Sequence, residues 1–228
     1  MILAASWAQE APRYEARHDH WRKSCTGTLE VGSDGMAYTE TSGKKKKHVW
    51  KWSYQEIQQL ELGSKRLRVV TYEDNGWKLG ADRELQFDLR EGDFSAVYRL
   101  LKDKLDQRLV TVIADEPAAV LWEVPVKLLG RMKGTEGVLK VGRERIVFET
   151  SKTGHSRTWR YEDIENVSSN GPFQLSLTTH ERAKSHYGNL RGFNFQLKSR
   201  LPEEKYTELW RRLNQSKGLP VLTSLSEK

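Results

Sequence analysis

The chain has 228 residues, of which 37% are hydrophobic and 30% are charged, and its formal net charge is +7. This length fits two domains of roughly 100 residues each, and the composition is that of a globular chain with apolar residues for two modest cores. No stretch approaches the roughly 18–20 apolar residues of a spanning helix, so the sequence excludes one. The single cysteine, Cys25, excludes an intramolecular disulfide and leaves the compartment open.

The first residues, Met1–Ala8, form a short apolar stretch that includes Ser6-Trp7-Ala8, a small-x-small pattern of the kind that signal peptidases cut. The stretch lacks a basic start and is short. Two interpretations stay open: a frayed N-terminus of a cytoplasmic protein, or a truncated signal peptide of a periplasmic or secreted one.

A hairpin is the first predicted element of the body of the chain. Leu29 and Val31 alternate with polar residues, Gly32-Ser33-Asp34-Gly35 is a turn sequence, and Met36 and Tyr38 resume the alternation. The same pattern returns in the second half of the chain. Its members there are Leu139, Val141, Gly142, Ile146 and Phe148.

A longer motif, His155–Val167, has an earlier echo at His48–Leu60. The two stretches match at one constant spacing. The matched pairs are His48 and His155, Trp52 and Trp159, Tyr54 and Tyr161, Glu56 and Asp163, Ile57 and Ile164, and Leu60 and Val167. Because the motif occurs twice in one chain, it indicates a structural signature with Trp52, Trp159, Ile57 and Ile164 as core anchors, and function is expected where the copies differ.

Each copy continues through short strands and ends in an amphipathic helix. Further strands are predicted around Leu67, Val69 and Tyr72; Leu85, Phe87 and Leu89; Leu175 and Leu177; and Phe193, Phe195 and Leu197. Asp93 is expected to cap a helix over Phe94–Leu105. Leu201-Pro202-Glu203-Glu204 begins a second helix, whose apolar stripe is Tyr206, Leu209, Trp210 and Leu213.

These elements predict a mainly β chain with one C-terminal helix per domain, in which each curled sheet is a partly open barrel and the helix covers an open end. The predicted segments are an N-terminal segment 1–17, a first domain 18–110, a linker 111–125, a second domain 126–218 and a C-terminal tail 219–228. Asp115-Glu116-Pro117 marks the linker, and most of the positive charge lies in the second domain.

The order Gly-x-Leu-x-Val, turn, apolar-x-aromatic, loop, Trp-x-Tyr-x-acid-Ile, further strands and a terminal helix resembles pleckstrin-homology-like domains, especially their GRAM and bacterial relatives. The resemblance covers about His18–Val110 and Val126–Gly218, and it implies two tandem domains of this fold. Phosphoinositide-binding members share a basic first hairpin loop. Here the loops are Gly32-Ser33-Asp34-Gly35 and Gly142-Arg143-Glu144-Arg145, so the chain departs from that pattern.

Four consecutive lysines, Lys44, Lys45, Lys46 and Lys47, occupy a predicted hairpin loop shortly before Trp50. Near an anionic bilayer each lysine could contribute on the order of 1 kcal/mol, and Trp50 could lie at the interface. These five residues are the candidate ligand or membrane site. The alternative is a solvated loop tip that resists aggregation, and the second copy has Lys152 alone at this place.

A second group, His18, His20, Cys25 and His48, contains the residue types of a zinc site. Strand spacing places His18 and His20 on one face, whereas Cys25 is in phase with the core residues Leu29 and Val31. Cys25 and the histidines are thus expected on opposite faces of the sheet, which favours a buried thiol and surface imidazoles. We therefore assign no metal ligand and no cofactor, and keep a metal-binding or hydrolytic protein as a third alternative.

Nucleic acid is disfavoured as a partner because Phe148, one of the aromatics between the arginines of the second copy, should face the core. Local motifs for catalysis are absent from the sequence, so we expect no enzyme. The function predicted from the sequence is a tandem binding module for a protein or peptide partner, with peripheral binding to anionic lipids through Lys44–Lys47 as the alternative. The oligomeric state is left open.

Overall fold

The structure is a computed structural model, and it describes residues 11–19, 24–42, 47–76, 81–130, 132–183 and 189–217. The chain divides into two compact units, Met1–Leu109 and Val110–Lys228. Both are mainly β, as the alternating patterns predict. Within the described ranges there is no helix long and apolar enough to cross a membrane.

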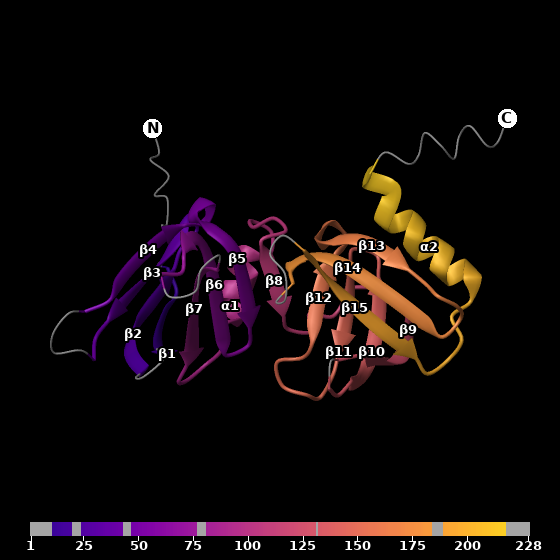
Figure 1. Cartoon of the computed structure of the whole chain (residues 1–228), viewed down its shortest axis with the longest axis horizontal. Helices are drawn as coiled ribbons and strands as arrows, with labels where there is room; N and C mark the ends of the chain where they lie inside the picture. The colour runs from indigo at the N-terminus through magenta and orange to yellow at the C-terminus, as the bar shows by residue number, and fades with distance from the viewer. Residues whose placement is uncertain are drawn as a thin grey trace, which may run out of the picture. The chain divides into compact units, whose positions relative to one another are not determined.

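The described residues of the first unit form seven strands and one short α-helix, which Figure 1 labels. They are β1 (Arg13–Asp19), β2 (Ser24–Val31), β3 (Gly35–Glu40), β4 (Val49–Ser53), β5 (Ile57–Gly63), β6 (Arg66–Asp74), β7 (Asp82–Leu89) and α1 (Ser95–Leu101). A short strand, β8 (Leu109–Val112), spans the division between the units.

The second unit repeats this order. Its elements are β9 (Val120–Leu128), β10 (Thr135–Gly142), β11 (Arg145–Glu149), β12 (Arg157–Arg160), β13 (Ile164–Ser168), β14 (Gln174–Arg182), β15 (Leu190–Leu197) and α2 (Glu203–Asn214). α2 packs against β13 (Figure 1). Strand β1 and the start of β9 thus extend into ranges for which the sequence predicted an N-terminal segment and a linker.

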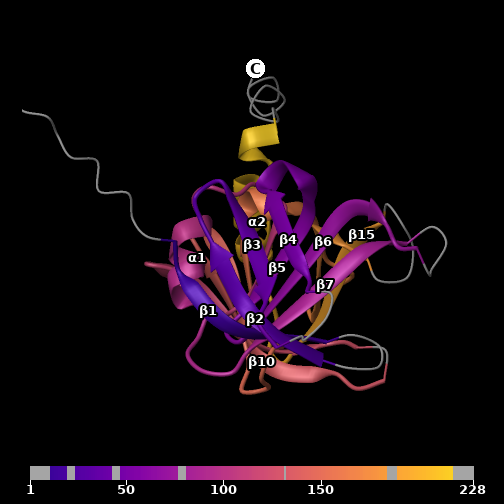
Figure 2. The same ribbon diagram turned by 90° about the vertical axis from the view of Figure 1, so that its left-hand side faces the viewer.

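Within each unit the strand pairs are antiparallel. The hydrogen-bonded order is equivalent in the two units: β5-β6-β7-β1-β2-β3-β4 and β13-β14-β15-β9-β10-β11-β12. Figure 2 shows β2, β3 and β4 of the first unit running side by side. Neither series closes on itself among the described residues, since β4 is not bonded to β5, nor β12 to β13. Each sheet is therefore open between its fourth and fifth strands.

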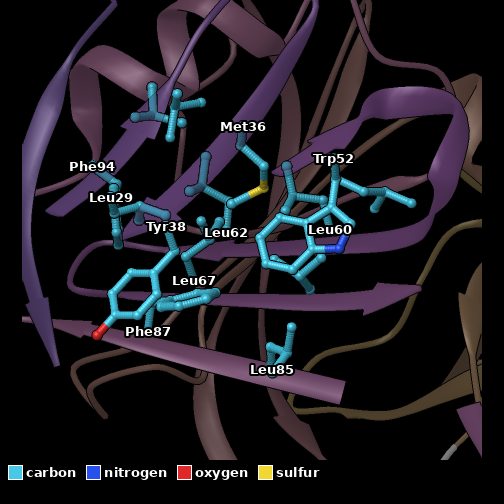
Figure 3. Close-up of a cluster of buried hydrophobic side chains, with 14 of the residues drawn as sticks. Leu29, Met36, Tyr38, Trp52, Leu60, Leu62, Leu67, Leu85, Phe87 and Phe94 are labelled. Atoms are coloured by element: carbon cyan, nitrogen blue, oxygen red, sulfur yellow. The ribbon is translucent and has the colours of Figure 1, made fainter. Parts of the chain in front are cut away.

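Two separate cores fill the units, as expected for a repeat. The predicted anchors Trp52, Ile57, Trp159 and Ile164 are all buried. In the first core, Tyr38 and Phe87 lie with ring centroids 4.9 Å apart, and Trp52 lies among the leucines of β5 and β6 (Figure 3). Phe148 is also fully buried, which confirms that it faces the core and is unavailable to a base.

The repeated motif has the same hydrogen bonds in both copies. The Tyr54 hydroxyl donates to the Gly32 carbonyl oxygen at 2.7 Å, and the Tyr161 hydroxyl donates to that of Gly142 at 2.8 Å. Both tyrosines open a single 3-10 turn, in which Glu56 or Asp163 accepts the backbone N–H three residues earlier. Burial raises the pKa of Tyr161 to about 12 and also raises the pKa of Tyr54, so both phenols stay protonated donors.

Two features of the helices depart from the sequence prediction. Helix α1 ends at Leu101, although Leu105 is still buried, and Asp93 accepts the Ser95 N–H at 2.8 Å. Trp210, predicted on the apolar stripe of α2, is 37% exposed because Leu209 and Leu213 already supply the buried face. Tyr72 lies on β6 as predicted, and it is 60% exposed because the alternation that buries Leu67 and Val69 continues to Thr71 and turns Tyr72 outward.

Candidate functional site

A cavity of about 430 Å³ lies in the first unit, at the end formed by β1, β4, β6 and β7. The side chains that shape it mix aromatic, cationic and acidic character. They include His18, His48, Trp50, Asp74, Arg83 and Glu84. The volume is in the range of small ligand sites and equally suits one large side chain of a bound peptide.

Trp50, a predicted site residue, is half-buried in the wall of this cavity. Its ring stacks on His48, with centroids 4.9 Å apart and planes at 11°, and lies 5.6 Å from the ring of Tyr38. The Arg83 guanidinium carbon is 5.3 Å from the Trp50 ring centroid, a cation–π distance. These contacts hold Trp50 in the wall of the cavity, and they are made within the unit without a membrane.

The lysine loop can be followed in part. Lys44, Lys45 and Lys46 lie outside the described residues, and Lys47 is exposed directly before His48. Lysine binding to an anionic surface therefore stays a prediction.

The equivalent place in the second unit has different chemistry. Arg157 stands where the first unit has Trp50, and its side chain is 9% exposed. Glu181 stands where the first unit has the exposed Glu73, and is 6% exposed at its side chain. Arg191 donates to Glu181 Oε2 at 3.0 Å, and Trp159 donates to Oε1 at 2.8 Å. A buried ionic cluster thus occupies the place at which the first unit has a cavity.

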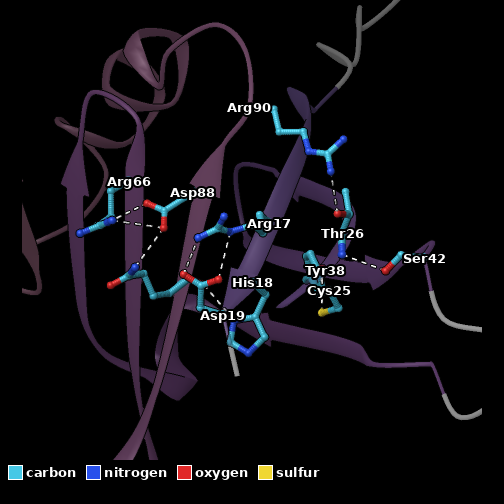
Figure 4. A network of polar contacts seen from close by, with 11 residues as sticks. Arg17, His18, Asp19, Cys25, Thr26, Tyr38, Ser42, Arg66, Asp88 and Arg90 are labelled. Carbon is cyan, nitrogen blue, oxygen red and sulfur yellow. Dashed lines mark hydrogen bonds and ion pairs between the residues drawn. The ribbon is translucent and has the colours of Figure 1, made fainter. Parts of the chain in front are cut away.

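His48, which lines the cavity, also belongs to a second group: ligand atoms of Cys25, Glu40 and His48 lie within 4.8 Å of one another. Cys25 belongs to β2, Glu40 ends β3, and His48 directly precedes β4. His48 Nδ1 is 3.0 Å from Glu40 Oε2, which also accepts the His48 backbone N–H at 3.0 Å. The Cys25 sulfur is 3.3 Å from the Tyr38 hydroxyl (Figure 4).

The parity argument that separated Cys25 from the histidines is wrong for His18. In the antiparallel pairing of β1 with β2, His18 lies directly opposite Cys25, so both face the core. His18 is buried, and its Nδ1–H donates to the Gln86 carbonyl oxygen at 2.8 Å (Figure 4). The prediction of a buried Cys25 thiol is confirmed. His20 lies outside the described residues.

Sequence reasoning did not include Glu40 in this group. Cys25 and Glu40 come from the successive strands β2 and β3, and His48 directly precedes the next strand, so only the strand register brings the three together. One sequence signal was available: the second copy has Thr135 and Thr150 at the places of Cys25 and Glu40, so two residues with ligand chemistry change together.

In the second unit, His155 replaces His48, and its Nδ1 is 3.4 Å from the Thr135 hydroxyl. Burial, followed by Lys152 and Arg157, lowers the pKa of His155, so the folded state holds this imidazole neutral.

We expect the stability of the second unit to fall as pH drops below about 6.5, the unfolded value for histidine, because the unfolded chain then binds the proton more readily. The His155→Gln variant should show a flatter dependence of unfolding free energy on pH between about 6.5 and the lower folded value. Urea unfolding at a series of pH values measures it, and an unchanged slope would contradict the assignment.

An exposed strand edge completes the candidate site. Glu40 N–H donates to the His48 carbonyl oxygen at 2.8 Å, so pairs such as Tyr38–Trp50 are the hydrogen-bonded ones in β3–β4. By alternation, the N–H and C=O groups of Val49 and Lys51 point away from β3. Strand β4 ends the hydrogen-bonded series of its unit among the described residues.

No family model and no curated protein matches the sequence. Among solved structures, the C-terminal domain of an unknown protein from Leishmania infantum aligns with a TM-score of 0.32 and 13% identity, over 42% of this chain and 84% of that chain. The heterodimer of Spt16D and Pob3N aligns with a TM-score of 0.34 and 11% identity, over 84% of this chain and 98% of that chain. At these TM-scores the two likenesses carry no conclusion about this chain.

Proposed function

We propose that the chain is a non-catalytic binding module of two tandem pleckstrin-homology-like, GRAM-like units, and that the first unit takes an extended peptide segment of a protein partner as an added strand on β4. Seven antiparallel strands followed by one helix, in the same order twice, support the proposed fold of two partly open barrels.

The peptide proposal depends on one observation: the edge strand β4 of the first unit and its equivalent in the second unit differ in whether another strand pairs with them. Strand β12 is the equivalent of β4, and Thr158 is the equivalent of Lys51. In the second unit, Thr158 pairs with Thr111 of β8, so this edge already holds an added strand. The Thr158 hydroxyl donates to the Ile113 carbonyl oxygen at 2.7 Å and accepts the Asp115 N–H at 2.9 Å. This edge of the fold therefore accommodates an extended segment.

The segment seated on the second unit also indicates the chemistry of such a partner. Its acidic end is held by basic side chains of the sheet: Asp115 pairs with Arg145, and Glu116 pairs with Lys140. The edge of the first unit is basic too, since Lys47 and Lys51 are exposed there, and Val49 is 66% exposed between them. We infer a partner segment in which acidic and apolar residues alternate.

Strand addition uses main-chain hydrogen bonds for affinity and side-chain pockets for specificity. A segment bonded to Val49 and Lys51 would lie next to the cavity, whose aromatic wall is Trp50. An apolar or aromatic side chain of the segment could enter there. On this proposal the cavity sets the specificity of the first unit, where the second unit has the cluster of Arg157 and Glu181 instead.

Lys51→Pro should weaken binding of an extended acidic peptide at least about tenfold, because proline removes an outward N–H and blocks the approaching strand. Lys51→Ala is the matched control, since it removes the side-chain charge and keeps the N–H. It should retain binding within a few-fold. The measurement is fluorescence anisotropy with labelled nonapeptides of alternating Val and Glu, titrated with the full chain.

Equal affinities of the proline and alanine variants would contradict strand addition, as would amide shifts on peptide binding that map away from β4. Vesicles containing phosphatidylserine form a second arm. Salt-sensitive vesicle binding that survives Lys51→Pro and disappears when Lys44–Lys47 become serines would favour the lipid alternative instead.

A further inference from the structure

We propose that Cys25, Glu40 and His48 form a zinc site in the first unit. Thiolate, carboxylate and imidazole are the three ligand types that Zn²⁺ takes in proteins, and a set of three leaves one coordination position for water or an incoming group. Zinc binding at this site does not require a peptide on the edge of β4.

The distances are close to those of a tetrahedral zinc site. Two ligands at about 2.0 Å from zinc are roughly 3.3 Å apart in that geometry. His48 Nδ1 and Glu40 Oε2 are 3.0 Å apart. The ligand atom of Cys25 is within 4.8 Å of both partners, against roughly 3.6 Å for a sulfur–nitrogen pair on zinc, so we expect metal binding to draw the sulfur closer to the other two ligands.

The surroundings suit a bound cation. Glu40 and Cys25 are both buried, at 7% and 6% exposure, and a buried carboxylate needs compensating charge. Tyr38 is placed as an outer partner: its hydroxyl is 3.3 Å from the sulfur and can donate to a thiolate.

The second unit provides an internal comparison. Its equivalent residues are Thr135, Thr150 and His155, so the imidazole persists while thiol and carboxylate are both replaced by hydroxyls. The hydroxyls are used locally: Thr135 contacts His155, and Thr150 donates to the Glu136 carbonyl oxygen at 2.6 Å. The fold thus tolerates uncharged residues at these places, and the ligand set of the first unit is a departure from what the fold requires.

The position of His48 connects the site to the cavity, because His48 lines the cavity and also contacts Glu40. A metal ion held by the three residues would lie beside the cavity, with one coordination position left. A carboxylate or imidazole of a bound partner could occupy that position in place of water.

The test uses the full chain, dialysed against a chelator and titrated with Zn²⁺ alone in competition with a metallochromic indicator. We expect one zinc ion per chain. Co²⁺ in place of Zn²⁺ should give the intense thiolate-to-cobalt charge-transfer band of a cysteine ligand and the visible spectrum of a tetrahedral site. These readouts report the metal directly and do not depend on any partner.

The variants Cys25→Thr and Glu40→Thr install the residues that the second unit has, so they should fold. Each should weaken zinc binding by more than the roughly 10–100-fold that loss of an outer partner costs. His155→Gln is the matched control and should leave zinc affinity unchanged. Near-ultraviolet circular dichroism confirms that each variant keeps its packing.

Three results would overturn the proposal: a folded wild-type chain that retains no zinc at micromolar concentration, a cobalt complex without the charge-transfer band, or threonine variants that bind zinc as wild type does. A Glu40→Gln variant guards against misfolding, since it keeps the size of the side chain. If that variant is folded and binds with wild-type affinity, Glu40 is not a ligand.

Discussion

Replacing Trp159 by Ala should lower the free energy of unfolding of the second unit by about 3–5 kcal/mol. The indole is 2% exposed, and its ring centroid lies 4.8 Å from that of Phe193 and 6.4 Å from that of Phe195. Its N–H also donates to buried Glu181 at 2.8 Å. The change therefore leaves both a cavity and a carboxylate that has lost a donor. Urea unfolding with hydrogen exchange followed separately in each unit measures the loss.

Trp52 in the first unit is the matched control for the hydrogen-bond part of this effect. Trp52 is buried to a similar degree, but no carboxylate accepts its indole N–H within the described part of the chain. Trp159→Phe should therefore cost more than Trp52→Phe, by about the 1–3 kcal/mol of an unsatisfied buried group. Equal losses of unfolding free energy for the two phenylalanine variants would show that the hydrogen bond from the indole to Glu181 does not stabilise the second unit.

Much of the fold follows from the sequence because the repeat constrains it. Residues that match at a constant spacing must occupy equivalent places, and Trp52, Trp159, Ile57 and Ile164 are buried as that argument requires. The hairpin at Gly32-Ser33-Asp34-Gly35 follows from turn chemistry, and the Gly32 N–H donates to the Gly35 carbonyl oxygen at 2.8 Å.

The candidate site follows from the sequence much less. Which side chains of two neighbouring strands share a face of the sheet depends on the register of their pairing. Spacing along one strand does not give that register. His18 was expected at the surface on parity alone, yet its pairing with Cys25 turns it inward. Among the described residues, β4 ends its series whereas the equivalent strand β12 pairs with β8, and this difference depends on where β8 pairs.

Glu181→Gln should destabilise the second unit by about 3–5 kcal/mol, because it removes the counter-charge of a buried cation while preserving the size of the side chain. The side chains of Glu181 and Arg157 are 6% and 9% exposed, and their closest charged atoms are 3.9 Å apart. Arg191 donates to the same carboxylate, with its guanidinium 4.8 Å from the Phe193 ring centroid. A glutamine satisfies the indole donor but leaves two cations close together.

The first unit offers the matched control, since Glu73→Gln makes the same change at the equivalent place. Glu73 and Arg83 are 2.7 Å apart but 61% and 37% exposed, so solvent screens the pair and we expect a loss of about 0–1 kcal/mol. A double variant, Glu181→Gln with Arg157→Met, should recover part of the loss by removing the buried cation. If Glu73→Gln and Glu181→Gln cost the same, burial does not set the strength of this cluster. The difference between the cavity of the first unit and the ionic cluster of the second would then have no energetic consequence for folding.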